Sequence, residues 1–164
     1  METALTFTLV VGLGATVALD VWARQLRRWF GIAGADWGLV GQWLVGLPAG
    51  RMVHTSAGFE ISSRGERALG WSFHYLVGLV YAAVYPLVWG EDFLAAPKVG
   101  PFILIGFALS TLAGLCVLTP ALGGGLFASR TPDQGRRIAL MLLNHAVFAG
   151  AQYALALGLV TAPT

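Results

Sequence analysis

The fold is decided by the stretch Glu66-Arg67-Ala68-Leu69-Gly70-Trp71-Ser72-Phe73-His74-Tyr75. Here a polar segment that carries arginines turns into an apolar run long enough to cross a membrane as a helix. In such a helix Glu66, Gly70 and His74 lie on one face, because they are four residues apart. An ionisable side chain just inside a membrane span is costly, so we treat His74 as a candidate functional residue.

The composition is typical of a membrane protein. Apolar residues make up 57% of the 164 residues and charged residues 11%, whereas a soluble domain would carry roughly twice that charged fraction. The single cysteine, Cys116, excludes a disulfide framework within one chain. There is neither a basic stripe with interleaved aromatic residues nor a nucleic-acid-binding motif, so we expect the lipid bilayer and not a nucleic acid as the partner.

Four apolar runs predict an all-α fold, an integral membrane bundle of four transmembrane helices in one domain that covers residues 1–164. Each run is close to the ~20 residues that a helix needs to cross a bilayer. The expected spans are residues 5–22, 71–89, 101–119 and 138–160. The loops 23–70 and 120–137 then lie on one side of the membrane, and the short turn at 90–100 lies on the other.

Two segments between the spans carry helix signals of their own. The first, Trp37 to Leu47, is apolar but too short to span a membrane. We expect it to form a short interfacial or re-entrant helix between the first and second spans, and a fifth span is the alternative. The second segment is Thr131-Pro132-Asp133-Gln134, which predicts the start of the fourth helix with Thr131 as its N-cap.

The basic residues predict the orientation of the chain. The loop 23–70 carries six arginines and the loop 120–137 carries three, whereas the other side carries only Lys98. Because basic residues collect on the cytoplasmic side, both loops are expected in the cytoplasm. We therefore expect a multi-pass protein of the bacterial inner (plasma) membrane with both termini on the periplasmic or external side.

The other ionisable groups gather toward the same arginine-rich side. Asp20 lies near that end of the first span, His74 lies one turn into the second, and His145 lies about 10 Å into the fourth at 1.5 Å per residue. His54 and Glu66 belong to the loop 23–70. We predict a polar pocket open to the cytoplasm, with the first three residues inside it and the last two at its mouth. Such a pocket would bind a metal ion, a proton or a small ligand.

Each of these residues also has a plainer interpretation. Asp20 can pair with Arg24, which follows it by one helical turn. The two histidines of the spans can hydrogen-bond to a neighbouring helix without binding any ligand. Glu66 and His54 can be ordinary residues of a solvated loop.

A transition metal ion is the cofactor that imidazole and carboxylate groups would suit. The spacing lends it little support, because the chain has neither a His-x-x-His nor a His-Glu-x-x-His motif. Glu66 and His74 are about 12 Å apart along a continuous helix, so both cannot bind one metal unless the helix breaks at Gly70. The sequence therefore leaves the cofactor open.

A second group of residues suits an anion. Arg51 and Arg130 lie on the arginine-rich side, and Arg130 follows a glycine-rich turn at Gly123-Gly124-Gly125. Backbone amides of such a turn, followed by a helix N-terminus, favour an anion. The phosphate of an anionic phospholipid is the natural ligand at the cytoplasmic leaflet. The alternative is that these arginines only set the orientation of the chain.

Short motifs follow one another in a defined order along nearly the whole chain. They are Gly14-Ala15-Thr16 with Asp20 and Trp22, Gly50-Arg51 with His54, Gly65-Glu66 with Gly70-Trp71 and His74-Tyr75, Ala128-Ser129-Arg130-Thr131-Pro132, and His145 with Phe148. In order and spacing these motifs resemble DUF2938, a bacterial family of uncharacterised small multi-pass membrane proteins. The resemblance implies an inner-membrane location and no particular activity.

Three hypotheses for the function follow. The first is a membrane protein whose pocket of Asp20, His74 and His145 binds a ligand. The second is a structural or accessory subunit that packs through small-residue faces, such as Gly12 and Ala15 on the first span, and that can form an oligomer. The third is a membrane enzyme that acts on a lipid or a quinone with a histidine as acid or base.

Overall fold

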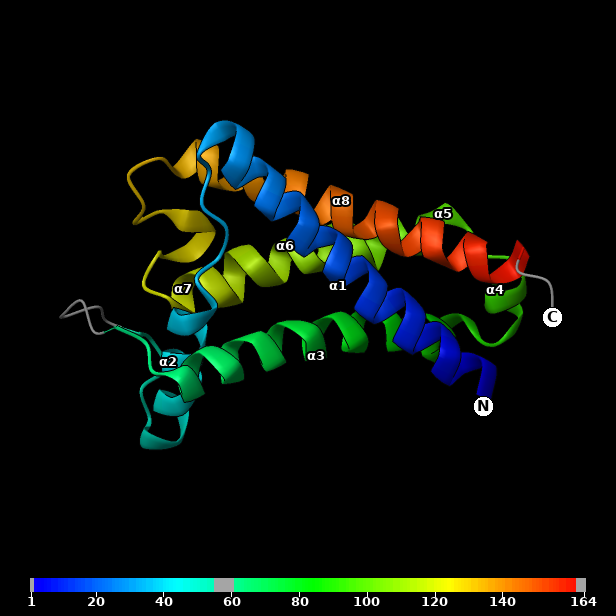
Figure 1. The fold of residues 1–164 in the computed structure, drawn as a ribbon, viewed down its shortest axis with the longest axis horizontal. Coiled ribbons are helices and arrows are strands. Elements are labelled where there is room, and N and C mark those ends of the chain that lie inside the picture. The colour runs from blue at the N-terminus through cyan, green and yellow to red at the C-terminus, as the bar shows by residue number, and fades with distance from the viewer. Residues whose placement is uncertain (1, 55–60, 162–164) are drawn as a thin grey trace. The chain divides into compact units, whose positions relative to one another are not determined.

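The computed structural model describes residues 2–54 and 61–161, and within these two ranges the chain is helical and has no strand. In chain order the elements are α1 (Glu2–Phe30), α2 (Trp37–Gly46), η1 (Leu47–Ala49), α3 (Arg64–Trp89), α4 (Asp92–Ala95), α5 (Val99–Phe102), η2 (Ile103–Leu109), α6 (Ser110–Ala113), η3 (Gly114–Leu118), α7 (Thr119–Ala121), η4 (Leu126–Ala128) and α8 (Gln134–Thr161) (Figure 1). The run from α5 to α7 is one continuous helix, which we call the third long helix (Val99–Ala121).

Four helices are long and apolar enough to cross a membrane, namely Thr3–Phe30, Arg64–Trp89, Val99–Ala121 and Gln134–Thr161. The predicted all-α fold with four such helices is therefore confirmed. The helices extend past the apolar runs that predict them. In α1, for example, Arg27 and Arg28 lie in the last turn. Their positive charges are stabilised there by the unpaired carbonyl groups of the helix end.

The short helix between the first and second long helices is α2, with ten residues. At 1.5 Å per residue it is about 15 Å long, half of the ~30 Å hydrocarbon thickness. Its N-terminus is capped by Asp36, whose carboxylate accepts hydrogen bonds from Gly38 N (2.8 Å) and Leu39 N (3.4 Å). The cap satisfies two amides that the helix itself leaves unpaired, which explains why the helix begins at Trp37.

The third long helix is α-helical only in part. Its stretches Ile103–Leu109 and Gly114–Leu118 are π-helical, so each turn there holds more residues than in an α-helix. Hydroxyl groups donate to carbonyls in both stretches: Ser110 donates to Gly106 O at 2.6 Å, and Thr119 donates to Gly114 O at 2.7 Å. Such bonds compete with the backbone ladder and accompany the wider turns.

The prediction that Thr131 caps α8 is wrong. The helix begins at Gln134, and the carbonyl of Asp133 accepts a hydrogen bond from Arg137 N at 3.0 Å. The hydroxyl of Thr131 instead donates to Ala128 O at 2.7 Å. The Thr131 side chain is thus used to close the preceding turn, and the helix starts after it.

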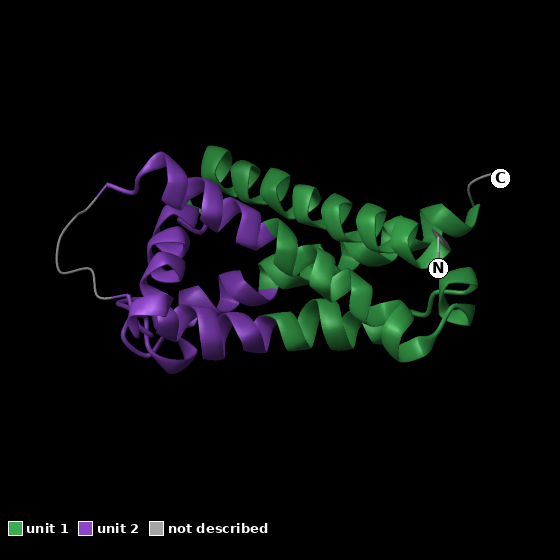
Figure 2. Cartoon of the chain, turned by 90° about the horizontal axis from the view of Figure 1, so that it is seen from below, with its two compact units in different colours: residues 1–34, 75–110, 143–164 green, residues 35–74, 111–142 purple. Residues whose placement is uncertain are grey.

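The described chain forms two compact units (Figure 2). Unit 1 comprises residues 1–34, 75–110 and 143–164, and unit 2 comprises residues 35–74 and 111–142. We describe each unit by itself.

The core of unit 1 is aromatic. Tyr85 is fully buried, and its ring contacts those of Phe102 (centroids 4.4 Å apart), Phe93 (5.9 Å) and Phe7 (6.2 Å). These rings come from α3, the third long helix, α4 and α1. The first turns of α1 and the last turns of α8 lie at the same end of this unit (Figures 1 and 2).

Small residues let α1 pack closely inside unit 1. A Cβ on Gly12 would lie 2.9 Å from the Cα of Leu79 on α3, and a Cβ on Gly14 would lie 2.7 Å from Leu155 on α8. Ala15 is fully buried. The small-residue face of α1 therefore contacts helices of the same chain.

In unit 2, α2 packs directly on the first part of α3. A Cβ on Gly41 would overlap the backbone carbonyl of Glu66, and a Cβ on Gly70 would overlap that of Trp37. The two backbones touch because neither helix has a side chain at these positions. This contact explains the glycines that interrupt the apolar run of α2.

Candidate functional site

Asp20 forms a hydrogen bond between two long helices of unit 1. The hydroxyl of Tyr75 on α3 donates to Asp20 Oδ2 on α1 at 2.8 Å, and both side chains are partly buried. A phenol donor stabilises a carboxylate that has lost most of its contact with water. The sequence does not identify Tyr75 as the partner of Asp20, because the two residues are 55 positions apart.

A second hydrogen bond joins α1 to α8, and it begins two residues after Asp20 in α1. The indole Nε1 of Trp22 donates to Asn144 Oδ1 at 3.1 Å. His145, the next residue, is half-buried in unit 1 and has at least one interaction partner. The predicted pocket residues Asp20 and His145 thus both belong to unit 1, on helices that the Trp22–Asn144 bond connects.

The third predicted pocket residue, His74, belongs to unit 2 and is buried. Its imidazole is stacked on the indole of Trp37, with ring centroids 4.0 Å apart. Trp71 approaches the imidazole edge-on, at 5.8 Å. Much of the surface of His74 is therefore covered by two indole rings.

Glu66 closes the N-terminus of α3. Its carboxylate accepts a hydrogen bond from Ser63 N at 2.7 Å, and the Ser63 hydroxyl accepts one from Glu66 N at 3.1 Å. This reciprocal pair is a capping box. The side chain of Gln42 on α2 also hydrogen-bonds this carboxylate, and His54 lies close enough to act on its charge. The two residues predicted at the mouth of the pocket, Glu66 and His54, thus both belong to unit 2.

The backbone of His54 holds it against the last residue of the third long helix, just before the loop 122–133. Its N–H donates to Ala121 O at 2.6 Å. That loop contains two non-glycine residues with positive φ, Phe127 (50°) and Ala128 (59°).

Arg51 and Arg130, the predicted phosphate ligands, are both exposed on unit 2. The loop is fixed by backbone hydrogen bonds such as Arg130 N to Gly124 O at 2.9 Å.

The described part of the chain contains no metal centre. Among residues 2–54 and 61–161, no three His, Cys, Asp or Glu side chains form a group that could hold a metal ion. A metal at the predicted pocket therefore receives no support from this part of the chain.

One polar pair was missed by the sequence analysis. The hydroxyl of Tyr85 donates to Gln152 Oε1 at 2.8 Å, and both side chains are fully buried in unit 1. The signal available in the sequence is the glutamine itself, a polar residue in the middle of an apolar helix. Its partner is 67 positions away and could not be identified from spacing.

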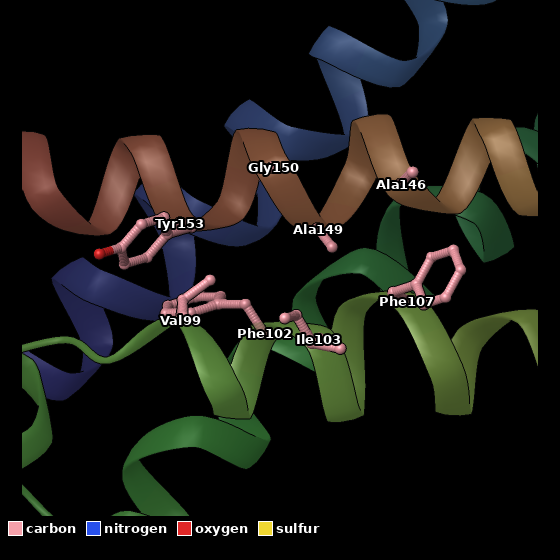
Figure 3. A pocket seen from close by; sticks show the side chains of 8 residues that line it. All are labelled: Val99, Phe102, Ile103, Phe107, Ala146, Ala149, Gly150 and Tyr153. Atoms are coloured by element: carbon pink, nitrogen blue, oxygen red, sulfur yellow. The ribbon is translucent and has the colours of Figure 1, made fainter.

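An apolar groove of about 390 Å³ lies between the third long helix and α8 in unit 1 (Figure 3). Tyr153 lies at one end of it and Phe107 at the other. On the α8 side, small residues lie between Phe107 and Tyr153, and a Cβ added to Gly150 would meet nothing within 4 Å. The groove is lined by Val99, Phe102, Ile103, Phe107, Ala146, Ala149, Gly150 and Tyr153. The groove is open to the surface, since Val99, Ile103 and Ala146 in its lining are exposed.

A family model described as "Protein of unknown function (DUF2938)" matches residues 9–159 of the chain. No curated protein and no solved structure is similar enough to match.

Proposed function

The chain belongs to the family DUF2938, whose description gives no activity, and we propose a function from the site itself. The protein is a multi-pass protein of the bacterial inner membrane that binds a proton at Asp20, at the cytoplasmic end of its spans. Tyr75 is the hydrogen-bond donor that holds the carboxylate, and His145 is a second titratable group in the same unit.

The observation that carries the proposal is the bond between Tyr75 and Asp20, at 2.8 Å between two helices that are apolar enough to span a membrane. Burying an ionisable group within such helices costs free energy, so its presence there indicates a functional site. Neutral pairs join membrane helices equally well, so a carboxylate is not needed merely to connect α1 to α3.

The arginines of α1 support a location of Asp20 on the cytoplasmic side of the membrane. Asp20 lies one helical turn before Arg24, and Arg27 and Arg28 follow in the last turn of α1. Basic residues of this density indicate the cytoplasmic side. The site would then exchange protons with the cytoplasm.

Of the three ligand classes that the sequence left open, a proton needs the fewest protein groups to bind it. A metal ion needs several ligands, and the described residues contain no group of three that could hold one. A proton needs one basic atom and a partner that responds to its charge, and Asp20 and Tyr75 provide both.

Infrared difference spectra between acidic and neutral buffer test this function, with the protein in lipid nanodiscs. We expect a C=O band of a protonated carboxyl that Asp20→Asn removes and Tyr75→Phe shifts, because the phenol donates to this carboxylate. Asp133→Asn serves as the control, because Asp133 is exposed in the turn before α8 and the band that this change removes should not respond to Tyr75→Phe. If Asp20→Asn leaves the spectra unchanged, the pair is only a structural link between helices.

A second candidate, an accessory subunit, is favoured by a different observation. Four small residues, Ala146, Gly150, Ala154 and Gly158, follow at intervals of four on α8, and all are exposed. Small residues at this spacing let helices of two chains approach closely. Gly158→Leu should then dissociate an oligomer measured by light scattering in detergent, since a Cβ on Gly158 meets nothing within 4 Å in the same chain. In contrast, Gly12→Leu should disturb the fold of the single chain. A monomeric wild type would remove this candidate.

A further inference from the structure

Only one of the two polar atoms of the Gln152 carboxamide has a hydrogen-bond partner among the described residues. Gln152 is fully buried, and its Oε1 accepts the hydrogen bond from Tyr85. Its Nε2 has no hydrogen-bond partner among the described residues. It therefore presents two N–H donors to the interior of unit 1 without an acceptor.

Such a donor is rare inside a membrane-spanning helix. Bulk water does not reach it, and a buried polar group without a partner strongly destabilises a protein in an apolar medium. Native structures satisfy nearly all such groups with protein atoms, ordered water or a ligand. The Nε2 of Gln152 therefore points to an acceptor that is not part of the described chain.

The backbone beside the amide is shaped to admit it. Gly106 lies in the π-helical stretch Ile103–Leu109, and a Cβ there would overlap Gln152 Oε1. The carbonyl of Gly106 is already engaged, because it accepts the Ser110 hydroxyl at 2.6 Å. π-Helical turns occur frequently at functional sites.

The apolar groove lies next to this position. Ala149 lines the groove, and its Cα and Cβ would both be 3.1 Å from a Cβ on Gly106. Phe102 also lines the groove, and its ring packs on Tyr85 with centroids 4.4 Å apart. Phe102 and Ala149 thus belong both to the lining of the groove and to the surroundings of the Tyr85–Gln152 pair.

We propose that Gln152 Nε2 is the donor of a buried binding site for a neutral acceptor oxygen in the aromatic core of unit 1. The oxygen belongs either to a trapped water molecule or to the carbonyl of a lipophilic molecule that enters through the groove. It is neutral because the surrounding side chains are rings and small apolar groups, which would not stabilise an anion. The site is separate from Asp20, since Tyr75 and Tyr85 are about 15 Å apart along α3 at 1.5 Å per residue.

Side-chain amide NMR of the full chain tests the proposal. The four glutamines, Gln25, Gln42, Gln134 and Gln152, are labelled with ¹⁵N in deuterated detergent, and Gln152→Leu assigns the signal of interest. Decylubiquinone is the carbonyl-bearing probe. Gln134 is the control, because it is exposed and its Nε2 donates to Phe127 O at 2.9 Å.

Two results support the site and identify the oxygen. A cross-peak from the Gln152 amide to water, with exchange at least tenfold slower than at Gln134, indicates a trapped water. Cross-peaks to the probe, which Gly150→Leu removes by filling the groove, indicate a lipophilic carbonyl. Contacts to protein protons alone, such as those of the Tyr85 ring after rotation of the amide, overturn the proposal.

Discussion

The imidazole of His74 on α3 lies nearly parallel to the indole of Trp37 on α2, with the two planes inclined by 24°. Trp71 contacts the same imidazole from the side, with planes inclined by 67°. Stacking of this kind contributes beyond the area that it buries. His74 is therefore part of the contact that holds α2 on α3, whatever further role it has.

The backbone contact between these helices predicts a strong effect of one methyl group. Gly70→Ala should lower the free energy of unfolding by about 1–3 kcal/mol, because the added Cβ overlaps the carbonyl of Trp37 and the helices must separate. Denaturation in detergent measures the loss, and hydrogen exchange of α2 should become faster. Gly135→Ala is the control, since a Cβ there meets nothing within 4 Å. Equal stability of the two variants would contradict the close contact.

The capping box predicts a graded response at the start of α3. Ser63→Ala should cost about 1 kcal/mol, because the amide of Glu66 loses its acceptor. Glu66→Gln should cost less, since a glutamine can still accept from Ser63 N. Hydrogen exchange of the first turn of α3 measures both effects. Ser72→Ala, at an exposed position in the same helix, should change little, and a comparable change there would argue against the cap.

The orientation of the chain is tested by reporter fusions at Thr164 and beside Arg64. We expect the fusion at Thr164 to be active outside the cytoplasm and the one beside Arg64 to be active inside it. The reason is the distribution of nine arginines on one side against Lys98 on the other. A cytoplasmic C-terminus would require that residues 37–47 also cross the membrane.

The loop that contains Arg130 is proposed to hold a lipid phosphate. Arg130→Ala should then reduce the anionic phospholipid that copurifies with the protein more than Arg24→Ala does. Both arginines are exposed, and as surface charges alone each would contribute about 1 kcal/mol. Mass spectrometry of bound lipid measures the difference. Equal losses would leave both residues with only a role in orientation.

The helices could be predicted from the sequence because their signals are local. Four apolar runs of span length and the short run that becomes α2 are visible without knowledge of any contact. The cap of α3 is visible too, since Ser63-Arg64-Gly65-Glu66 has the spacing of a capping box. The start of α8 was predicted wrongly because the Thr131 hydroxyl bonds backward to Ala128.

The candidate site could be predicted only in part, because its bonds join residues that are distant in the chain. The cost of burying a charge marks Asp20, but nothing in the sequence selects Tyr75 as its donor. The same holds for Tyr85 and Gln152, which share a bond across the core of unit 1. The fit of Gly70 against Trp37 likewise depends on tertiary packing and has no local signal.

The π-helical turns of the third long helix have a consequence for any mutagenesis of this protein. A helical wheel drawn at 100° per residue loses its phase at Ile103–Leu109, and it loses it again at Gly114–Leu118. Positions beyond each stretch therefore point in directions that the wheel does not give. The accessibility of single cysteines along Val99–Ala121 should follow a helical period that changes phase at each of the two stretches. Deleting one residue within either stretch would rotate the side chains of the part of the helix that follows.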